Sequence, residues 1–440
     1  MTVVDLPVRS GPKGPAQVRN GTIAALDIGS TKVSCFIAEP VAARHRSPDG
    51  EDKSSLRILG VGHQASRGIR NGMIVDVDQA ERAIRLAVDA AERTAKRSIS
   101  DVYVNIAGGR PQSTMQQASV HVATGQVTPL DIDTVIHAAA TRVLPKGRAV
   151  LHVAPAQFHL DDARGVTLPL GMFGQRLSVD LNIVSAEASA MRNLALAVER
   201  CHLSVADYVV APYASARAVL VEDEMKLGVT LIDMGGATTS IAAFQDGQLI
   251  FASVVPLGGQ HVTQDIARGL STTIAHAERM KTLWGSALAT AIDDREMVAV
   301  PLLGERGVDT VHHVPKSMLT GIIRPRLEET FEMLRDQIEA STFARLAGNR
   351  VVLTGGASQL TGIREMAGQC LNRSVRLGSP LPLQGLPETA RSAGFSVSAG
   401  LLAYALKPDR HYTIDHARNP SGDFNNTYLR RVGKWIAESF

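Results

Sequence analysis

Cysteine is scarce in this chain. Its 440 residues include only Cys35, Cys201 and Cys370, and none of these forms a C-x-x-C pair. Single cysteines scattered through apolar stretches match neither a zinc site nor a disulfide framework. We therefore expect three reduced side chains that pack in a reducing compartment.

Aromatic residues are also few, and long basic and long apolar runs are missing. Aromatics make up 4% of the chain and the net charge is +3, which argues against a base-stacking or generally nucleic-acid-binding surface. No apolar run reaches the roughly 18 residues of a membrane-spanning helix. The first residues lack the apolar core of a signal peptide, and 1–19 are expected to be a disordered arm. The length indicates two or more domains.

Two common nucleotide-binding motifs are absent as well. The chain has no G-x-x-x-x-G-K-[ST] loop, and no G-x-G-x-x-G follows a strand-like segment. A P-loop protein and a Rossmann dinucleotide site are therefore not supported.

A different glycine-containing motif occurs twice. Residues 23–31 read IAALDIGST and residues 229–239 read VTLIDMGGATT. Each pattern predicts a strand, a tight glycine turn and a second strand. We expect the glycines to adopt positive φ angles and let the backbone approach a ligand, while successive N–H groups form an anion-binding nest. Asp27 and Asp233 end the first strands, where they are placed to hold a hydrated Mg²⁺. Two such hairpins predict related half-domains that grip a triphosphate.

Further segments fit the same cleft. Residues 257–267 contain a glycine pair before a helix, and 277–281 read AERMK, which places Glu278 and Lys281 on one helix face. That pair suits ribose hydroxyls, although a surface ion pair is the commoner explanation of such spacing. Residues 351–363 predict a strand, a glycine pair and a helix N-terminus, whose dipole favours phosphate.

The remaining pattern is mixed α/β. The sequence pattern changes near residue 101, where several strand-like segments begin. These segments indicate an inserted α+β subdomain. Apolar periodicity predicts helices at 79–97, 131–143, 211–220, 263–283, 317–346 and 361–369.

The order of these segments resembles the actin/DnaK-chaperone/sugar-kinase superfamily over about residues 20–406. Within it, LDIGSTKV, GVGHQASRGIRNGMIVD, SISDVYVNIAGG, EDEMKLGVTLIDMGGATT and VVLTGGASQLTGI resemble the FtsA family of bacterial cell-division proteins. The resemblance implies an α/β, actin-like two-domain fold with duplicated ribonuclease-H-like halves. It also implies the following division of the chain: subdomain IA at 20–100, 188–212 and 379–406; IC at 101–187; IIA at 213–262 and 321–378; IIB at 263–320; a flexible linker at 407–426; and a membrane-targeting amphipathic helix at 427–440.

The resemblance further implies a role in division. Members of the family bind ATP, polymerise, hold the tubulin-like FtsZ polymer at the inner face of the cytoplasmic membrane and recruit later divisome proteins. The expected ligands are therefore ATP and Mg²⁺. The expected partners are the FtsZ C-terminal peptide, other copies of this chain, other divisome proteins and an anionic membrane surface, with no nucleic acid.

The paired hairpins and the later segments predict individual contacts. The phosphates are expected to face Asp27, Gly29, Ser30, Thr31 and Lys32 from one side and Asp233, Gly235, Gly236 and Thr238 from the other. The ribose and adenosine are expected to lie against Glu278, Lys281, Gly355, Gly356 and Ser358.

Two departures from related sequences carry expectations of their own. Ala237 stands where relatives have a third glycine, and alanine tolerates positive φ poorly, so that turn is expected to differ. Ala211 and Pro212 stand where chaperone relatives have a glutamate before the proline. Without a side chain there to orient water, we expect no catalytic residue and slow hydrolysis, with ATP acting as a structural switch.

The last residues form a second kind of site. On a helix, one stripe would contain Leu429, Val432, Trp435, Ile436 and Phe440, flanked by Arg430, Arg431 and Lys434. Such a helix suits an anionic lipid interface, weakly as one copy and tightly as a polymer. The alternative is a helix docked on its own domain, against which the long polar linker argues.

The FtsZ surface is predicted from charge. Residues 301–326 supply Arg306, Lys316, Arg324 and Arg326, which can meet an acidic peptide. A solvated charged face is the alternative explanation.

Two other functions stay open at this point, a small-molecule kinase and a pilus-assembly or cell-shape homologue of actin. A kinase needs a catalytic carboxylate, which the crossing helix lacks. The insert and the terminal helix distinguish this chain from the pilus and cell-shape proteins.

Overall fold

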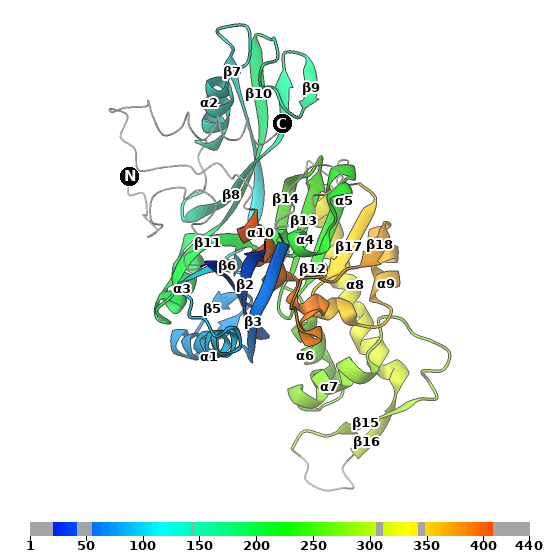
Figure 1. Ribbon diagram of the computed structural model, residues 1–440. Helices are drawn as coiled ribbons and strands as arrows, with labels where there is room; N and C mark the ends of the chain where they lie inside the picture. Colours follow the sequence, from blue (N-terminus) through cyan, green and yellow to red (C-terminus); the bar gives the residue numbers. More distant parts are fainter. Residues whose placement is uncertain (1–20, 42–54, 142–144, 305–310, 342–347, 408–440) are drawn as a thin grey trace.

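Two β-sheets organise the molecule (Figure 1). The computed structural model describes residues 21–41, 55–141, 145–304, 311–341 and 348–407. The N-terminal arm, Arg306, nearly all of the linker and the C-terminal helix predicted from the sequence lie outside these residues.

The first sheet has five strands among the described residues, in the order β11-β6-β1-β2-β3. β1 pairs antiparallel with β2 and parallel with β6, and β6 pairs parallel with β11. The strands are β1 (Ile23–Ile28), β2 (Lys32–Val41), β3 (Ser55–Ala65), β6 (Asp101–Ile106) and β11 (Ser204–Val210), and a small ribbon of β4 (Ile69–Arg70) and β5 (Met73–Ile74) follows β3. Helices α1 (Val77–Ala95) and α3 (Ala188–Glu199) pack against this sheet, and α10 (Ser396–Leu406) packs on β1.

Helix α1 forms as its apolar spacing predicts. Its buried residues are Ala80, Ala83, Ile84, Ala87, Val88 and Ala91. Asp76 caps the start, because its carboxylate accepts a hydrogen bond from the Gln79 backbone N at 3.0 Å. Gly62 on β3 lets the helix approach: a Cβ there would lie 2.1 Å from the Ala87 carbonyl oxygen.

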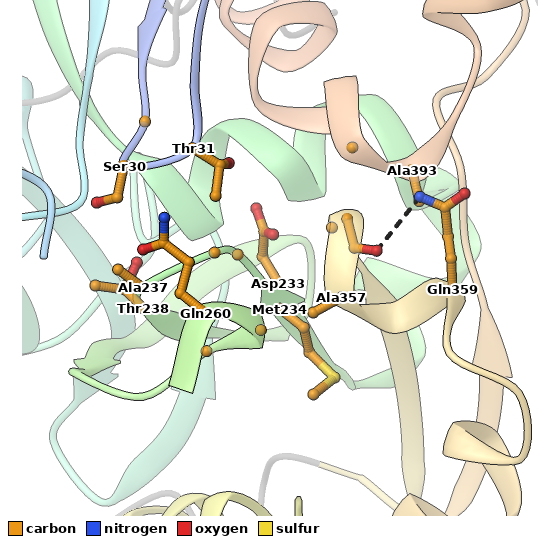
Figure 2. Close-up of a pocket in the computed structure, with 18 of the residues that line it drawn as sticks. Ser30, Thr31, Asp233, Met234, Ala237, Thr238, Gln260, Ala357, Gln359 and Ala393 are labelled. Atoms are coloured by element: carbon orange, nitrogen blue, oxygen red, sulfur yellow. Dashed lines mark hydrogen bonds between the residues drawn. The ribbon is translucent and has the colours of Figure 1, made fainter. Parts of the chain in front are cut away.

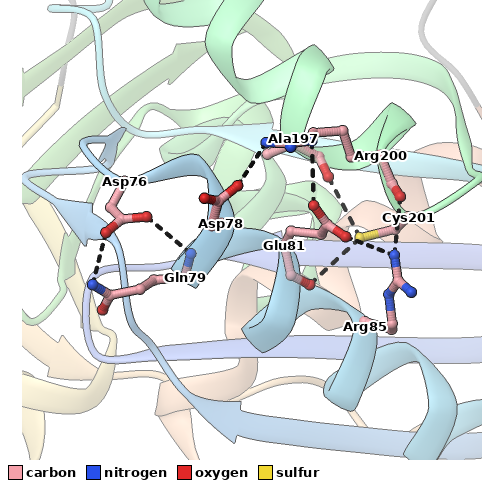
Figure 3. A network of polar contacts seen from close by, with 8 residues as sticks. All are labelled: Asp76, Asp78, Gln79, Glu81, Arg85, Ala197, Arg200 and Cys201. Carbon is pink, nitrogen blue, oxygen red and sulfur yellow. Dashed lines mark hydrogen bonds and ion pairs between the residues drawn. The ribbon is translucent and has the colours of Figure 1, made fainter.

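Ion pairs join α1 to the end of α3 (Figure 3). Arg200 lies 2.9 Å from Asp78 and 3.3 Å from Glu81, and Arg85 lies 2.7 Å from Glu81. The groups are partly exposed, so each pair stabilises the fold by little. Together they fix where the chain enters β11.

The second sheet runs β18-β17-β12-β13-β14-β7-β10-β8-β9 through the described part of the chain. Its first five strands belong to the second half, and its last four to the insert. They are β12 (Val229–Met234), β13 (Thr239–Gln245), β14 (Gln248–Val255), β17 (Arg350–Thr354), β18 (Ser374–Leu377), β7 (Gln112–His121), β8 (Arg148–Leu160), β9 (Ala163–Val166) and β10 (Arg176–Glu187). α2 (Pro129–Ala140) packs on β7 and β10.

The insert is hydrogen-bonded edge to edge with the second half. Ser253 of β14 stands opposite Gln112 of β7, and the Asn182 side-chain amide donates to the Leu249 carbonyl at 2.9 Å. β6, which opens the interval assigned to IC, instead lies in the first sheet beside β1. The insert therefore begins after β6.

The second half carries the other helices. They are α4 (Ala211–Val219), α5 (Glu222–Leu227), α6 (Gly259–Gly269), α7 (Ile274–Trp284), α8 (Lys316–Ala340) and α9 (Ile363–Leu371), with a ribbon of β15 (Met297–Pro301) and β16 (Val311–Pro315). Short 3-10 turns occupy Gly356–Gln359, Glu388–Ala390 and Ala393–Phe395. The predicted boundaries at 212, 262 and 320 each fall inside a helix, and the other boundaries stay predictions.

One helix prediction was wrong in detail. The expected single helix at 263–283 is two helices, because Ser271 takes a φ of +49° and Thr273 caps a new start. The helix predicted at 361–369 is α9, and a short 3-10 turn separates the glycine pair at 355–356 from its start at Ile363. No α-helix dipole therefore starts at that glycine pair. None of the described helices is long and apolar enough to cross a membrane.

Candidate nucleotide-binding site

A cleft of about 410 Å³ opens between the two halves and is lined by both hairpins (Figure 2). Its volume falls in the range of small-ligand pockets, roughly 300–1,000 Å³. The predicted residues that line it are Asp27, Gly29, Ser30, Thr31, Lys32, Asp233, Gly235, Gly236, Thr238, Glu278, Lys281, Gly355 and Gly356. Residues more than 300 positions apart in the sequence thus meet in one cavity.

The two hairpins share one turn geometry. The Gly29 N–H donates to the Lys32 carbonyl at 3.0 Å, and the Gly235 N–H donates to the Thr238 carbonyl at 2.9 Å. Neither glycine has a positive φ, so that expectation was wrong. Glycine is required for space instead. A Cβ on Gly29 would lie 2.9 Å from the Lys32 carbonyl oxygen, and a Cβ on Gly235 would lie 2.8 Å from the Thr238 carbonyl oxygen.

Ala237 leaves the second turn intact. It is buried, lines the cleft and has no positive φ. The turn around it closes with the same hydrogen bond as the first hairpin. The expectation that alanine alters this turn was therefore wrong, because the position does not need the conformation that alanine disfavours.

Two buried carboxylates lie in the cleft. Burial raises the pKa of Asp27 to about 7, opposed by the Lys32 charge and reinforced by the Asp233 charge. Burial likewise raises the pKa of Asp233, whose carboxylate accepts a hydrogen bond from Ser215 of α4. Buried carboxylates with incomplete compensation favour a bound cation. The pair therefore fits a hydrated Mg²⁺, although the described residues contain no ready-made cluster of metal ligands.

Lys32 connects the first hairpin to the start of α10. Its ammonium donates to the Gly394 carbonyl and lies 3.5 Å from the centre of the Phe395 ring. Burial lowers the pKa of Lys32, while Asp27 and Asp233 oppose that change. A phosphate entering the cleft would offer this cation a stronger partner than a carbonyl.

Two glycines allow close approaches in the cleft, one between the halves and one within the second half. A Cβ on Gly236 would lie 2.2 Å from Cγ2 of Thr31 in the opposite hairpin. Gly355 has a φ of +90°, and a Cβ there would lie 2.3 Å from Oδ1 of Asp233. Gly356 differs, because nothing lies within 4 Å of its Cβ position and it borders the cleft.

Glu278 and Lys281 both border the cleft and also pair with each other. The Lys281 ammonium lies 2.7 Å from Glu278 and donates to Thr263 at 2.8 Å and to the Gly259 carbonyl at 3.0 Å. The ion pair that their spacing suggests is thus present within α7, and the Lys281 hydrogen bonds to Thr263 and Gly259 tether α7 to α6 at the cleft edge.

Ser358 does not line the cleft. It is buried, and its hydroxyl donates to the Gly355 carbonyl at 2.8 Å, so its predicted contact with adenosine is replaced by support of the glycine loop. Sequence reasoning missed Asn105, whose side-chain oxygen accepts from the Ile28 N–H at 2.7 Å, and Gln260, which points into the cleft in Figure 2. Both residues lie in segments that the sequence singled out, Gln260 after the glycine pair and Asn105 in SISDVYVNIAGG, but neither was assigned to the cleft.

The three described cations of the predicted surface are already paired within the chain. Lys316 lies 2.8 Å from Glu296, Arg324 lies 2.8 Å from Glu328, and Arg326 lies 2.6 Å from Asp265. These cations are charge-compensated in the described structure, and their role toward a peptide stays a prediction.

Known proteins resemble this chain along nearly its whole length. A family model described as "Cell division protein FtsA" matches residues 230–400, and a model for the SHS2 domain inserted in FtsA matches 108–185. The chain is 45% identical to cell division protein FtsA of Rhizobium meliloti over 426 residues, covering 96% of each. It belongs to the FtsA family of cell division proteins. FtsA proteins of Pseudomonas aeruginosa and Escherichia coli K12 are 33% and 30% identical, over 97% and 95% of this chain and 100% and 98% of theirs.

Solved structures confirm the actin-like fold expected for an FtsA protein. A chain of the PilM–PilN type IV pilus biogenesis complex superposes with a TM-score of 0.60 at 16% identity, over 88% of this chain and 99% of that one. MreB5 of Spiroplasma citri bound to ADP superposes with a TM-score of 0.51 at 12% identity, over 87% and 95%. The SHS2 match covers β7 to β10, so the FtsA insert coincides with the strands that extend the second sheet.

Proposed function

We propose that this chain binds ATP with Mg²⁺, polymerises, and tethers the FtsZ ring to the inner face of the cytoplasmic membrane at the division site. In the same assembly it helps recruit later divisome proteins. The observation that carries the nucleotide part is the meeting of two matching hairpins, each with a buried aspartate, on opposite sides of one cleft. Membership of the FtsA family supports the division part.

The cleft offers each part of the nucleotide a suitable contact. Backbone N–H groups of both turns and the Lys32 ammonium would hold the phosphates. Asp27 and Asp233 would hold the metal through its water ligands, and the metal would supply charge neutralisation. Glu278 and Lys281 would contact the ribose, and Gly355 and Gly356 would let the backbone lie against adenosine. The ADP bound to the MreB5 relative supports this assignment.

Hydrolysis would be slow in such a site. The carboxylates that line the cleft in the described part of the chain are Asp27, Asp233 and Glu278. Two of these are assigned to the metal and one to the ribose. Helix α4 enters the cleft with Ala211, which has no group that could orient an attacking water. ATP therefore acts as a switch or a structural ligand.

The FtsZ peptide would bind on the β15–β16 side of the second half. Met297, Leu303 and Met318 are exposed there, close in sequence to Lys316 and Arg324. An acidic peptide with apolar side chains would match exposed apolar groups beside cations that exchange one carboxylate for another. Arg306 is assigned to the same surface from the sequence alone.

The membrane contact would be made by residues 427–440. The predicted stripe around Trp435 would enter the lipid interface, and Arg430, Arg431 and Lys434 would face anionic headgroups. A pilus-assembly or cell-shape role is less well supported, because the PilM–PilN and MreB5 structures share the fold at 16% identity or below, whereas FtsA proteins share 30–45%.

Co-sedimentation with anionic vesicles tests the tether. Wild type should pellet with the vesicles, and both Trp435→Glu and a truncation before Thr427 should stay in solution while keeping ATP affinity. Equal pelleting of all three proteins would refute membrane attachment through the tail.

A further inference from the structure

Helices α4 and α10 each pack on the sheet that does not precede them in the chain. Helix α4 follows β11 of the first sheet but packs on β12, β13 and β14 of the second. Helix α10 follows the second half but packs on β1, β2 and β6 of the first sheet. The two helices lie side by side in Figure 1, and a Cβ on Gly400 would lie 1.6 Å from the Ala214 carbonyl oxygen. Their backbones are therefore in direct contact.

Helix α4 carries a buried serine that contacts the carboxylate of the second hairpin. The Ser215 hydroxyl is fully buried and donates a hydrogen bond to Oδ2 of Asp233 on β12. Asp233 lines the cleft, whereas Ser215 does not. The hydroxyl therefore holds the carboxylate from the protein side, away from the space that a ligand would fill.

Helix α10 carries a corresponding serine for the first hairpin. Ser398 is fully buried, does not line the cleft, and its hydroxyl hydrogen-bonds to the Asp27 carboxylate. Its oxygen also lies 2.7 Å from the hydroxyl oxygen of Ser34, which stands directly opposite Asp27 in the pairing of β1 with β2. Since the Ser398 proton is directed to the carboxylate, Ser34 is the donor in this second hydrogen bond.

The two serine–carboxylate contacts are crossed between the halves. The helix that leaves the first sheet holds the carboxylate of the second hairpin, and the helix that follows the second half holds the carboxylate of the first. Because α4 and α10 touch along their backbones, one helix pair fixes both carboxylates relative to each other. The hairpins alone do not provide such a connection, since they belong to different sheets.

We propose that Ser215 and Ser398 are positioning residues for the metal that accompanies ATP, each orienting one of the two carboxylates that hold the hydrated Mg²⁺. The inference rests on the nucleotide site of the proposed function. Two carboxylates can share the water shell of one cation only while their separation and direction are kept, and hydrogen bonds to the ligand side chains keep them. Neither serine would itself touch the nucleotide or the metal.

Ser396 offers a matched comparison on the same helix. It is as buried as Ser398, its hydroxyl donates to the Ala393 carbonyl at 2.9 Å, and its oxygen lies 2.6 Å from the Thr354 hydroxyl oxygen. Neither of these partners is a carboxylate. Ser396→Ala therefore removes a buried, hydrogen-bonded hydroxyl from α10 and leaves both metal-binding carboxylates with their partners.

ATP affinity with and without the metal tests the proposal. A fluorescent ATP analogue is titrated into each protein, once with excess Mg²⁺ and once with EDTA. Ser215→Ala and Ser398→Ala should each raise the Kd measured with Mg²⁺ about tenfold, the lower end of the usual loss when the partner of a metal ligand is removed. The Kd measured with EDTA should stay near the wild-type value, because the groups that contact the nucleotide are unchanged.

Further variants separate positioning from stability. Ser396→Ala should lower the unfolding temperature about as much as Ser398→Ala does, but it should leave the Kd measured with Mg²⁺ unchanged. Ser215→Cys and Ser398→Cys keep nearly the volume of serine with a weaker donor, so their Kd with Mg²⁺ should lie between those of wild type and the alanine variants. The cysteine variants keep the test valid if an alanine variant folds poorly.

Three results would overturn the proposal. A Kd that rises equally with Mg²⁺ and with EDTA would show that the serines support the fold and not the metal. An unchanged Kd with Mg²⁺ would show that the carboxylates need no such partners. An equal loss in Ser396→Ala would trace the effect to the packing of α10. Failure of the proposed nucleotide site gives a different result, since the wild type would then bind the analogue in neither solution.

Discussion

Gly356→Asp should weaken ATP binding without weakening the fold. Nothing lies within 4 Å of the Cβ position of Gly356, so the new side chain meets no protein atom and extends into the cleft. There it adds a negative charge to a site that already contains Asp27, Asp233 and Glu278. The new carboxylate would also repel the negatively charged phosphates of ATP. Two unit charges about 7 Å apart, at an effective dielectric constant of about 20, repel by about 2 kcal/mol. That corresponds to about a thirtyfold rise in the Kd for ATP.

The assay is equilibrium titration with a fluorescent ATP analogue, alongside thermal unfolding. Gly321→Asp is the matched control, because Gly321 is exposed on α8 and also has nothing within 4 Å of its Cβ position. The control should bind ATP as wild type does, and both variants should unfold near the wild-type temperature. An unchanged ATP affinity in Gly356→Asp would refute the assignment of this loop to the nucleotide.

Three more predictions follow from the same geometry. Steady-state phosphate release should stay below about one per second, the lower end of typical enzyme turnover, because Ala211 orients no water; a faster rate would refute the switch role. Hydrogen bonds from Arg376 hold the pKa of Glu224 below its usual range, so the pair stabilises the fold above that usual value and loses its effect as the pH falls through the lowered pKa. Glu224→Gln should therefore cost about 1–3 kcal/mol of unfolding free energy at pH 7 and progressively less below about pH 4.5, and a pH-independent cost would count against the pair. Arg324→Glu should break the contact with Glu328 and weaken binding of the FtsZ C-terminal peptide in a fluorescence anisotropy titration, and unaltered affinity would exclude this part of the surface.

Much of the cleft could be predicted because it rests on local turn chemistry. A strand that ends in Asp, followed by a glycine turn, specifies a hairpin within a dozen residues, and both copies fold as expected. The reason for the glycines was not predictable in the same way. The close approach of Gly236 to Thr31 depends on how the halves pack, and that of Gly355 to Asp233 depends on the pairing of β17 with β12.

Local turn geometry and long-range contacts explain the errors. Ser358 reads as part of a nucleotide loop, but the 3-10 turn directs its hydroxyl to Gly355. The sequence suggests that the cations assigned to a partner are exposed. Arg326 instead donates a hydrogen bond to the carboxylate of Asp265 on α6, 61 positions away in the sequence. Periodicity could not find the break between α6 and α7, because both sides keep the same apolar spacing and only the left-handed Ser271 separates them.

The central claim is that this chain links FtsZ to a membrane, and a three-component sedimentation assay measures it most directly. Anionic vesicles, FtsZ polymers and this protein with ATP should pellet together. FtsZ should remain in the supernatant when the protein is omitted or replaced by Trp435→Glu. Pelleting of FtsZ with vesicles to the same extent in all three mixtures, or its absence from every pellet, would contradict the account.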